Sequence, residues 1–103
     1  MSEIAKDGSQ TIVKPGQDVV ASFVPGLREE LRALMEEGPK ELVIDLSGIE
    51  MVDSVGIGVF IATHNSMSKS GGKFVVTNVS KDIYNLFKTM RLHQHFEVRM
   101  AEG

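Results

Sequence analysis

Apolar and polar positions recur along the chain with two different periods, and the change of period predicts where helices and strands lie. Over residues 25–36 the leucines stand four and three residues apart, the spacing of one helical face. A second helix is predicted over residues 54–69, and a third after Ser80, a residue suited to cap a helix. The first half of the 54–69 helix is apolar on every side, so we expect it to lie inside the domain.

Short segments rich in β-branched and aliphatic residues are typical of strands. The predicted strands are residues 11–14, 18–24, 41–46, 73–79 and 96–100. The first is expected at a sheet edge, and the third and fourth have the composition of strands covered on both faces. Residues 1–10 are polar and aperiodic, which predicts a loosely ordered N-terminus.

Strands that alternate with helices require crossover connections, and crossovers produce a mainly parallel sheet. A chain of 103 residues is long enough to bury one core. We therefore predict a single α/β domain over residues 1–103, with a mainly parallel or mixed sheet of about four to five strands and about three to four helices. With so few helices, we expect one face of the sheet to be covered better than the other.

Composition and charge exclude several classes of function. Without cysteine there are no disulfides, no thiol catalysis and no cysteine zinc site. A net charge of −3 gives no overall attraction to nucleic acid or anionic lipid. The start has no basic segment before an apolar stretch, and the longest apolar run, residues 55–62, is far shorter than the ~20 residues that span a bilayer. We therefore expect a cytoplasmic protein without membrane insertion.

Residues 45–58, DLSGIEMVDSVGIG, carry the most informative pattern. Glycine within a helix costs roughly 1 kcal/mol relative to alanine, so Gly56 and Gly58 indicate close approach of the helix to the sheet or of another molecule to the helix start. Backbone N–H groups and the helix dipole favour negative charge there, so a phosphate on the hydroxyl of Ser54 is one interpretation. A plain helix cap is the other, and the adjacent Asp53 would repel a phosphate.

An enzyme is not favoured. The nucleophile motif G-x-S-x-G fails because Val52 stands two residues before Ser54. His64 lies ten residues further along the predicted helix, about 15 Å at 1.5 Å per residue, too far for a direct hydrogen bond. His93 and His95 have no third ligand beside them, and no glycine-rich nucleotide loop is present, so we predict no metal and no cofactor.

The third predicted helix has a basic flank formed by Lys81, Lys88 and Arg91. Such a flank is usually a solvated face, and its functional alternative is attraction to an acidic partner. The sequence alone leaves both interpretations open.

DLSG at residues 45–48 and DSVGIG at residues 53–58 resemble the signature of STAS domains, the anti-sigma factor antagonist (anti-anti-sigma factor) family. The likeness runs over nearly the whole chain in the same order of elements. In that family an anti-sigma factor kinase phosphorylates a serine or threonine at the position of Ser54, and a PP2C-type phosphatase restores it. The unphosphorylated form binds the kinase and frees its sigma factor. The resemblance thus implies a bacterial, cytoplasmic phosphoprotein that regulates transcription through protein–protein interaction.

By this resemblance Ser54 is the phosphoacceptor, and no residue is catalytic. The implied partner-binding residues are Asp53, Val55, Gly56, Ile57, Gly58, Ser22 and Asn78. Many members carry an aspartate near the position of Ser22, and its absence leaves the partner's identity open. Two alternatives remain: a constitutive scaffold in a bacterial signalling complex, and a cytoplasmic subunit of a lipid-transport ATPase. The sigma factor, the upstream signal and the oligomeric state, a homodimer included, are also open.

Overall fold

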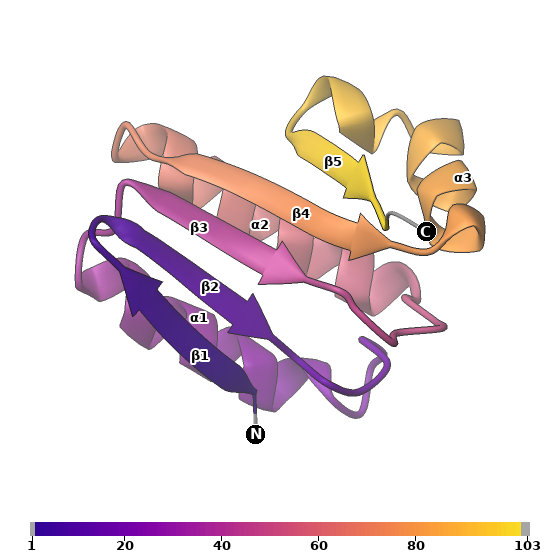
Figure 1. Cartoon of the computed structure of the whole chain (residues 1–103), viewed down its shortest axis with the longest axis horizontal. Helices are drawn as coiled ribbons and strands as arrows, with labels where there is room; N and C mark the ends of the chain where they lie inside the picture. Colours follow the sequence, from indigo (N-terminus) through magenta and orange to yellow (C-terminus); the bar gives the residue numbers. More distant parts are fainter. Residues whose placement is uncertain (1, 102–103) are drawn as a thin grey trace.

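The computed structural model describes residues 2–101. Their strands form one five-stranded sheet in the order β1-β2-β3-β4-β5 (Figure 1). The strands are β1 (Glu3–Asp7), β2 (Gln10–Lys14), β3 (Glu41–Asp45), β4 (Lys73–Val79) and β5 (Glu97–Met100). The helices are α1 (Val24–Glu36), α2 (Ser54–Lys69), α3 (Lys81–Thr89) and the short 3-10 helix η1 (Leu92–Gln94). Only β1 and β2 pair antiparallel, and the other neighbours are parallel. The predicted α/β class with a mixed sheet is confirmed.

The predicted strand over residues 11–14 is confirmed as β2, which begins one residue earlier, but the rest of the N-terminal part differs from the prediction. β1 occupies a segment predicted to be loosely ordered, and all five of its residues pair with β2, which is therefore not an edge strand. Every β1 residue is exposed, so no apolar alternation marks it, and the hairpin turn at Gly8 has a φ of +62°. Residues 18–24 form no strand: Val19 makes a single bridge to Val52, and α1 begins at Val24. In this segment Val19 is buried and Val20 and Phe23 are half-buried, so the loop covers part of the core.

The later elements follow the sequence pattern closely. α2 and β4 have the predicted bounds, and β3 ends one residue earlier than predicted. The hydroxyl of Ser80 accepts the N–H of Ile83 at 3.2 Å, so Ser80 is the N-cap of α3 as expected. None of the helices within residues 2–101 combines the length and the apolar character needed to cross a membrane.

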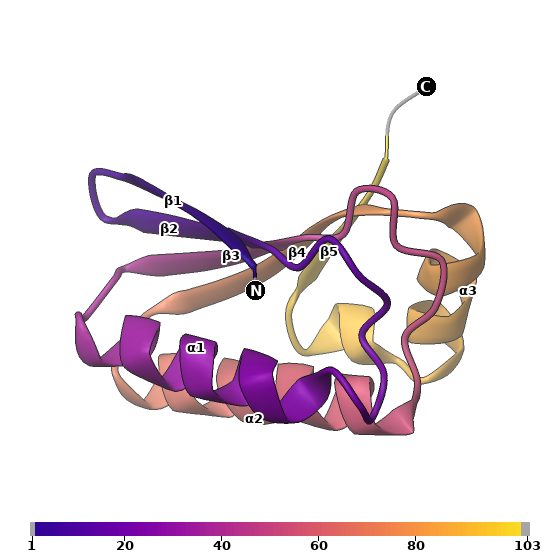
Figure 2. The same cartoon turned by 90° about the horizontal axis from the view of Figure 1, so that it is seen from below.

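The core lies between the sheet and the helices, which all stand on one side of it (Figure 2). The ring of Phe60 in α2 lies 6.1 Å from that of Phe74 in β4 and 6.2 Å from that of Phe87 in α3. No helix within the described part of the chain covers the opposite face, so the prediction of one poorly covered face is confirmed (Figure 2). The alternation of β4 places Lys73 and Val75 on that face, where Lys73 forms an ion pair with Glu97 at 3.1 Å.

Candidate functional site

The start of α2 is held in place by one carboxylate. Asp53 is the N-cap: its Oδ1 accepts the N–H of Gly56 at 2.9 Å, and its Oδ2 accepts the N–H of Ala21 at 2.9 Å. The N–H of Asp53 donates in turn to the carbonyl of Val19 at 3.2 Å. The hydrogen bonds from Gly56 and then Ala21 lower the pKa of the Asp53 carboxyl, because they favour its charged form. α2 therefore begins at a fixed position against the loop of residues 15–23.

A second carboxylate, which the sequence analysis did not single out, joins the same two loops. Oδ1 of Asp18 accepts the N–H groups of Glu50 at 3.0 Å and Met51 at 3.2 Å. The N–H of Val19 donates to the carbonyl of Met51 at 3.0 Å. The signal available in the sequence was an aspartate after the turn residues Pro15-Gly16, since aspartate side chains often accept hydrogen bonds from loop backbone.

Ser54 is the first residue of α2 and is exposed. Its hydroxyl makes no hydrogen bond with any residue of the described chain, while Asp53 supplies the cap. The interpretation of Ser54 as a helix cap is therefore wrong. A hydroxyl that is free of intramolecular partners and open to solvent is accessible to another macromolecule.

Gly56 and Gly58 have different surroundings. A Cβ at position 56 would lie 2.2 Å from the carbonyl oxygen of Val19, so only glycine allows α2 to approach this loop so closely. A Cβ at position 58 would meet no atom within 4 Å. Packing within the chain explains the first glycine and not the second, whose position faces outward.

The prediction that the first half of α2 lies inside the domain is wrong for one of its faces. The exposed residues of that face are Ser54, Val55, Gly58, Ile61, Ala62 and Asn65. Val55 is 41% exposed and Ile61 is 37% exposed, because α2 belongs to a single layer of helices with nothing outside it. Gly56 and Ile57 are buried instead, so they support the site from within and are not surface that a partner could contact.

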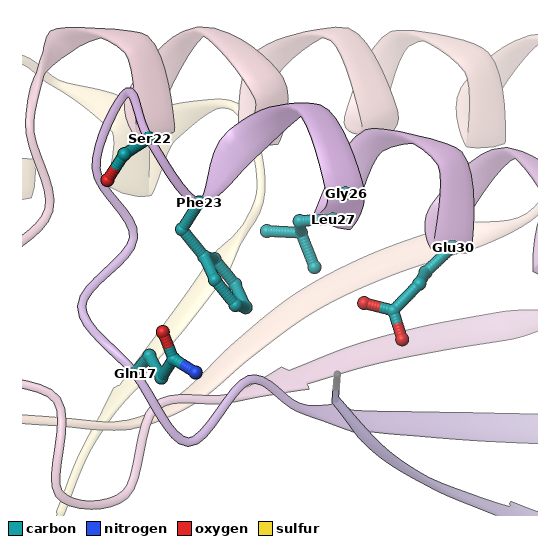
Figure 3. Close-up of a pocket in the computed structure, with 6 residues that line it drawn as sticks. All are labelled: Gln17, Ser22, Phe23, Gly26, Leu27 and Glu30. Carbon is teal, nitrogen blue, oxygen red and sulfur yellow. The ribbon is translucent and has the colours of Figure 1, made fainter.

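Ser22 is exposed on the loop that Asp53 holds through the adjacent Ala21. The structure thus brings it to the same end of the domain as the start of α2. It also borders a hollow of about 410 Å³ at the start of α1. Figure 3 shows Phe23, the residue before α1, with its ring toward the strands, Leu27 of α1 beside it, and Gln17 opposite them in this hollow.

Asn78 lies near the end of β4 with a φ of +57°, a left-handed conformation that asparagine tolerates better than most residues. Its Nδ2 donates to Oδ1 of Asp45 at 3.0 Å, and the backbone N–H and hydroxyl of Ser47 donate to the same oxygen. Asn78 thus organises the loop after β3 and makes no hydrogen bond to α2. Its place in a partner surface stays a prediction.

His64 contributes to packing and is not part of the candidate site at the start of α2. Its ring centroid lies 5.6 Å from that of Phe96, and its Nδ1 is buried without a hydrogen-bond partner in the described structure. Among residues 2–101, no hydrogen bond joins an imidazole to the hydroxyl of Ser54. The geometry of the site is that of an exposed serine on a rigid helix start.

The family model for the STAS domain matches residues 2–103. The anti-sigma-B factor antagonist of Staphylococcus aureus (strain NCTC 8325 / PS 47) is 28% identical over 76 residues, which cover 74% of this chain and 70% of that protein. Its counterpart in Bacillus subtilis (strain 168) is 40% identical over 63 residues, 61% of this chain and 57% of that protein. The crystal structure of an anti-sigma factor antagonist from Mycobacterium paratuberculosis has the same fold, with a TM-score of 0.84 at 24% identity, covering 96% of this chain and 84% of that one.

Proposed function

Because this chain belongs to the STAS domain family, we propose that it is an anti-sigma factor antagonist that docks on its anti-sigma factor through the start of α2. Support comes from two relatives that carry this name, 28% and 40% identical to the chain. The exposed residues of the candidate set, Ser22, Ser54, Val55 and Gly58, form the proposed contact surface. The protein then acts by binding, without a reaction of its own.

Ser54 is the proposed switch, and the observation that carries this proposal is its free, exposed hydroxyl at the first position of α2. The anti-sigma factor acts as a serine kinase: the Ser54 oxygen attacks the γ-phosphorus of ATP bound to the kinase. The Oγ–P bond forms, the bond to the β-phosphate oxygen breaks, and ADP leaves. The hydroxyl proton passes to a base of the kinase. A PP2C-type phosphatase later hydrolyses the Oγ–P bond and restores the serine.

The proposed effect of phosphorylation is loss of the partner, not unfolding. A phosphate adds about −1.5 to −2 charges, and next to a helix N-terminus it gains about 0.3–1 kcal/mol from the dipole. Within an interface the same charge would be desolvated beside the carboxylate of Asp53, whose lowered pKa keeps it charged. The complex therefore becomes unfavourable while the free domain stays folded.

The decisive measurement is intact mass after incubation with the anti-sigma factor and Mg-ATP. We expect the wild-type chain to gain about 80 Da, the mass of one phosphoryl group, and Ser54→Ala to gain nothing. Ser68→Ala, at another exposed serine of α2, is the matched control and should gain as the wild type does. If Ser54→Ala is phosphorylated to the same extent, another residue is the phosphoacceptor and Ser54 is not the switch. If the wild type is never phosphorylated, a constitutive scaffold or transporter subunit becomes the better account.

A further inference from the structure

A groove of about 240 Å³ runs between α1 and α2, which lie side by side under the sheet (Figure 2). Its lining residues are Arg28, Leu31, Arg32 and Met35 of α1 and Val59, Ala62, Thr63 and Ser66 of α2. The only charged residues among these are the two arginines. The floor is apolar, since Leu31 and Val59 are almost completely buried.

Two carboxylates on the β1 side of α1 are bound by the N-terminal part of the chain. On the flank toward β1, Glu30 accepts hydrogen bonds from the N–H of Ser2 at 3.1 Å and from its hydroxyl at 2.9 Å, and Glu37 pairs with Lys6. These two carboxylates are therefore satisfied by the chain itself, while Glu29 and Glu36 are exposed on α1 near Arg32. The basic flank, with Arg28 and Arg32 four residues apart on one side of the helix, faces the groove instead.

α2 offers the arginines no countercharge, because its sequence contains neither aspartate nor glutamate. Arg32 pairs only with Glu29 of its own helix, at 3.6 Å and with both side chains more than half exposed, which contributes little. Within residues 2–101, Arg28 forms no ion pair. Two guanidinium groups thus border an apolar groove with their hydrogen-bonding capacity largely unused.

We propose that this groove binds an acidic segment of the anti-sigma factor, whose carboxylates pair with Arg28 and Arg32 while an apolar side chain covers the groove floor. The inference rests on the proposed function and extends its contact surface. Charge complementarity selects the acidic occupant, because guanidinium groups bind carboxylates in paired hydrogen bonds. The same helix links the two places: Ala62 of the groove lies on the exposed face of α2 that begins at Ser54.

The test measures the affinity of the full-length anti-sigma factor for charge variants by titration calorimetry. The double variant Arg28→Glu/Arg32→Glu should bind at least about tenfold more weakly and show a smaller dependence of affinity on salt. The control Lys81→Glu/Lys88→Glu makes the same change of charge on the basic flank of α3 and should lose less than about threefold. Because glutamate at position 32 would repel neighbouring glutamates of α1, Arg28→Gln/Arg32→Gln serves as a milder second variant, with a loss of about threefold or more.

Substitutions at position 62 provide an independent test of how the sign of the charge in the groove affects binding. Glutamate at this position would supply the missing countercharge inside the chain, so Ala62→Glu should raise Tm and weaken binding. Ala62→Lys adds similar bulk with similar helix propensity and leaves the arginines free, so it should bind at least about fivefold more tightly than Ala62→Glu. Equal affinities for these two variants would overturn the electrostatic role of the groove.

The outcomes separate the two proposals. Suppose that the wild type binds the anti-sigma factor and that the α1 and α3 variants weaken binding equally. General electrostatic attraction then explains the effect, and the groove inference fails while the proposed function stands. If the α1 variants bind as the wild type does, the inference fails as well, while the Ser54 surface stands. If the wild type does not bind the anti-sigma factor at all, both proposals are wrong.

Discussion

Two glycines of α2, only two residues apart, differ in how closely the rest of the chain approaches them. Gly56 lies against the carbonyl of Val19, whereas the space outside Gly58 is empty. The difference matters because the helix loses about 0.5–1 kcal/mol at each glycine relative to alanine. At Gly56 close packing of the loop offsets that loss, and at Gly58 no intramolecular contact does.

The same substitution at the two positions should therefore have effects of opposite sign. Gly58→Ala should raise Tm by about 3–5 °C, because alanine favours the helix and meets no obstacle. Gly56→Ala should lower Tm by at least about 5 °C, because its Cβ would overlap the carbonyl of Val19. Thermal unfolding followed by circular dichroism measures both, and each variant is the other's control. A gain in Tm for Gly56→Ala would contradict the close contact.

The carboxyl of Asp53 makes a prediction about pH. Its pKa is lowered from the ordinary 3.8 by hydrogen bonds from backbone N–H groups, so the folded state binds this proton less readily than the unfolded chain does. The stabilisation is then fully present above pH 3.8 and is lost as the pH falls through the lower, folded-state pKa. NMR titration of the side-chain carboxyl should place its midpoint below 3.8.

Asp53→Asn removes the titrating group and is the control for that prediction. Its free energy of unfolding should fall less steeply with acid than that of the wild type, although its stability at neutral pH is lower because Nδ2 cannot accept the N–H of Ala21. Identical acid dependence in the two proteins would contradict a lowered pKa at Asp53.

At the scale of elements, two loops and the first turn of α2 form one unit. Asp18 holds the loop before α2, Asp53 holds the loop before α1, and the bridge between Val19 and Val52 joins both loops. Such cross-connection positions Ser54 on a rigid support, which a kinase or binding partner requires for a defined contact.

Asp18→Ala should loosen this unit without touching the exposed face of α2. We expect a loss of stability of about 1 kcal/mol, because two backbone N–H groups lose their acceptor. Hydrogen exchange at the amides of Glu50 and Met51 should accelerate, and the anti-sigma factor should bind more weakly. Asp18→Asn keeps an acceptor oxygen at this position and is the control. Unchanged exchange at both amides in Asp18→Ala would show that Asp18 does not hold the loop.

At the scale of the whole molecule, the placement of every helix on one side of the sheet creates two unlike surfaces (Figure 2). The open sheet face carries ion pairs such as Lys73–Glu97, which already satisfy one another. The helical face carries exposed apolar side chains on α2 and, on α1, Arg28, which forms no ion pair within residues 2–101. The helical face is therefore the side on which we expect a protein partner.

A phosphate mimic should change binding without changing the fold. Ser54→Asp should keep its Tm within about 3 °C of the wild type, because a negative charge at a helix start is tolerated or slightly favourable. Its affinity for the anti-sigma factor should fall at least about tenfold, because the charge is desolvated beside Asp53 in the complex. Ser54→Ala should bind as the wild type does. Wild-type affinity in Ser54→Asp would exclude regulation by charge at this serine.

Local sequence determined those features that depend on a few neighbouring residues. The apolar spacing of α3, the composition of β4 and the cap at Ser80 lead to the observed elements because each is decided within one or two helical turns or one strand. The motif DSVGIG also identified the start of α2 with Ser54 at its first position.

Tertiary structure alone decided the rest, because those features depend on residues distant in sequence. The exposed strand β1 exists through its pairing with β2, and Asp53 became the cap that also reaches Ala21, 32 residues away. The need for glycine at position 56 comes from a carbonyl in another loop. The basic groove likewise appears only when α1 and α2 lie side by side. The sequence of α1 contains the arginines, but it does not show that the neighbouring helix will be α2, which has no acidic residue.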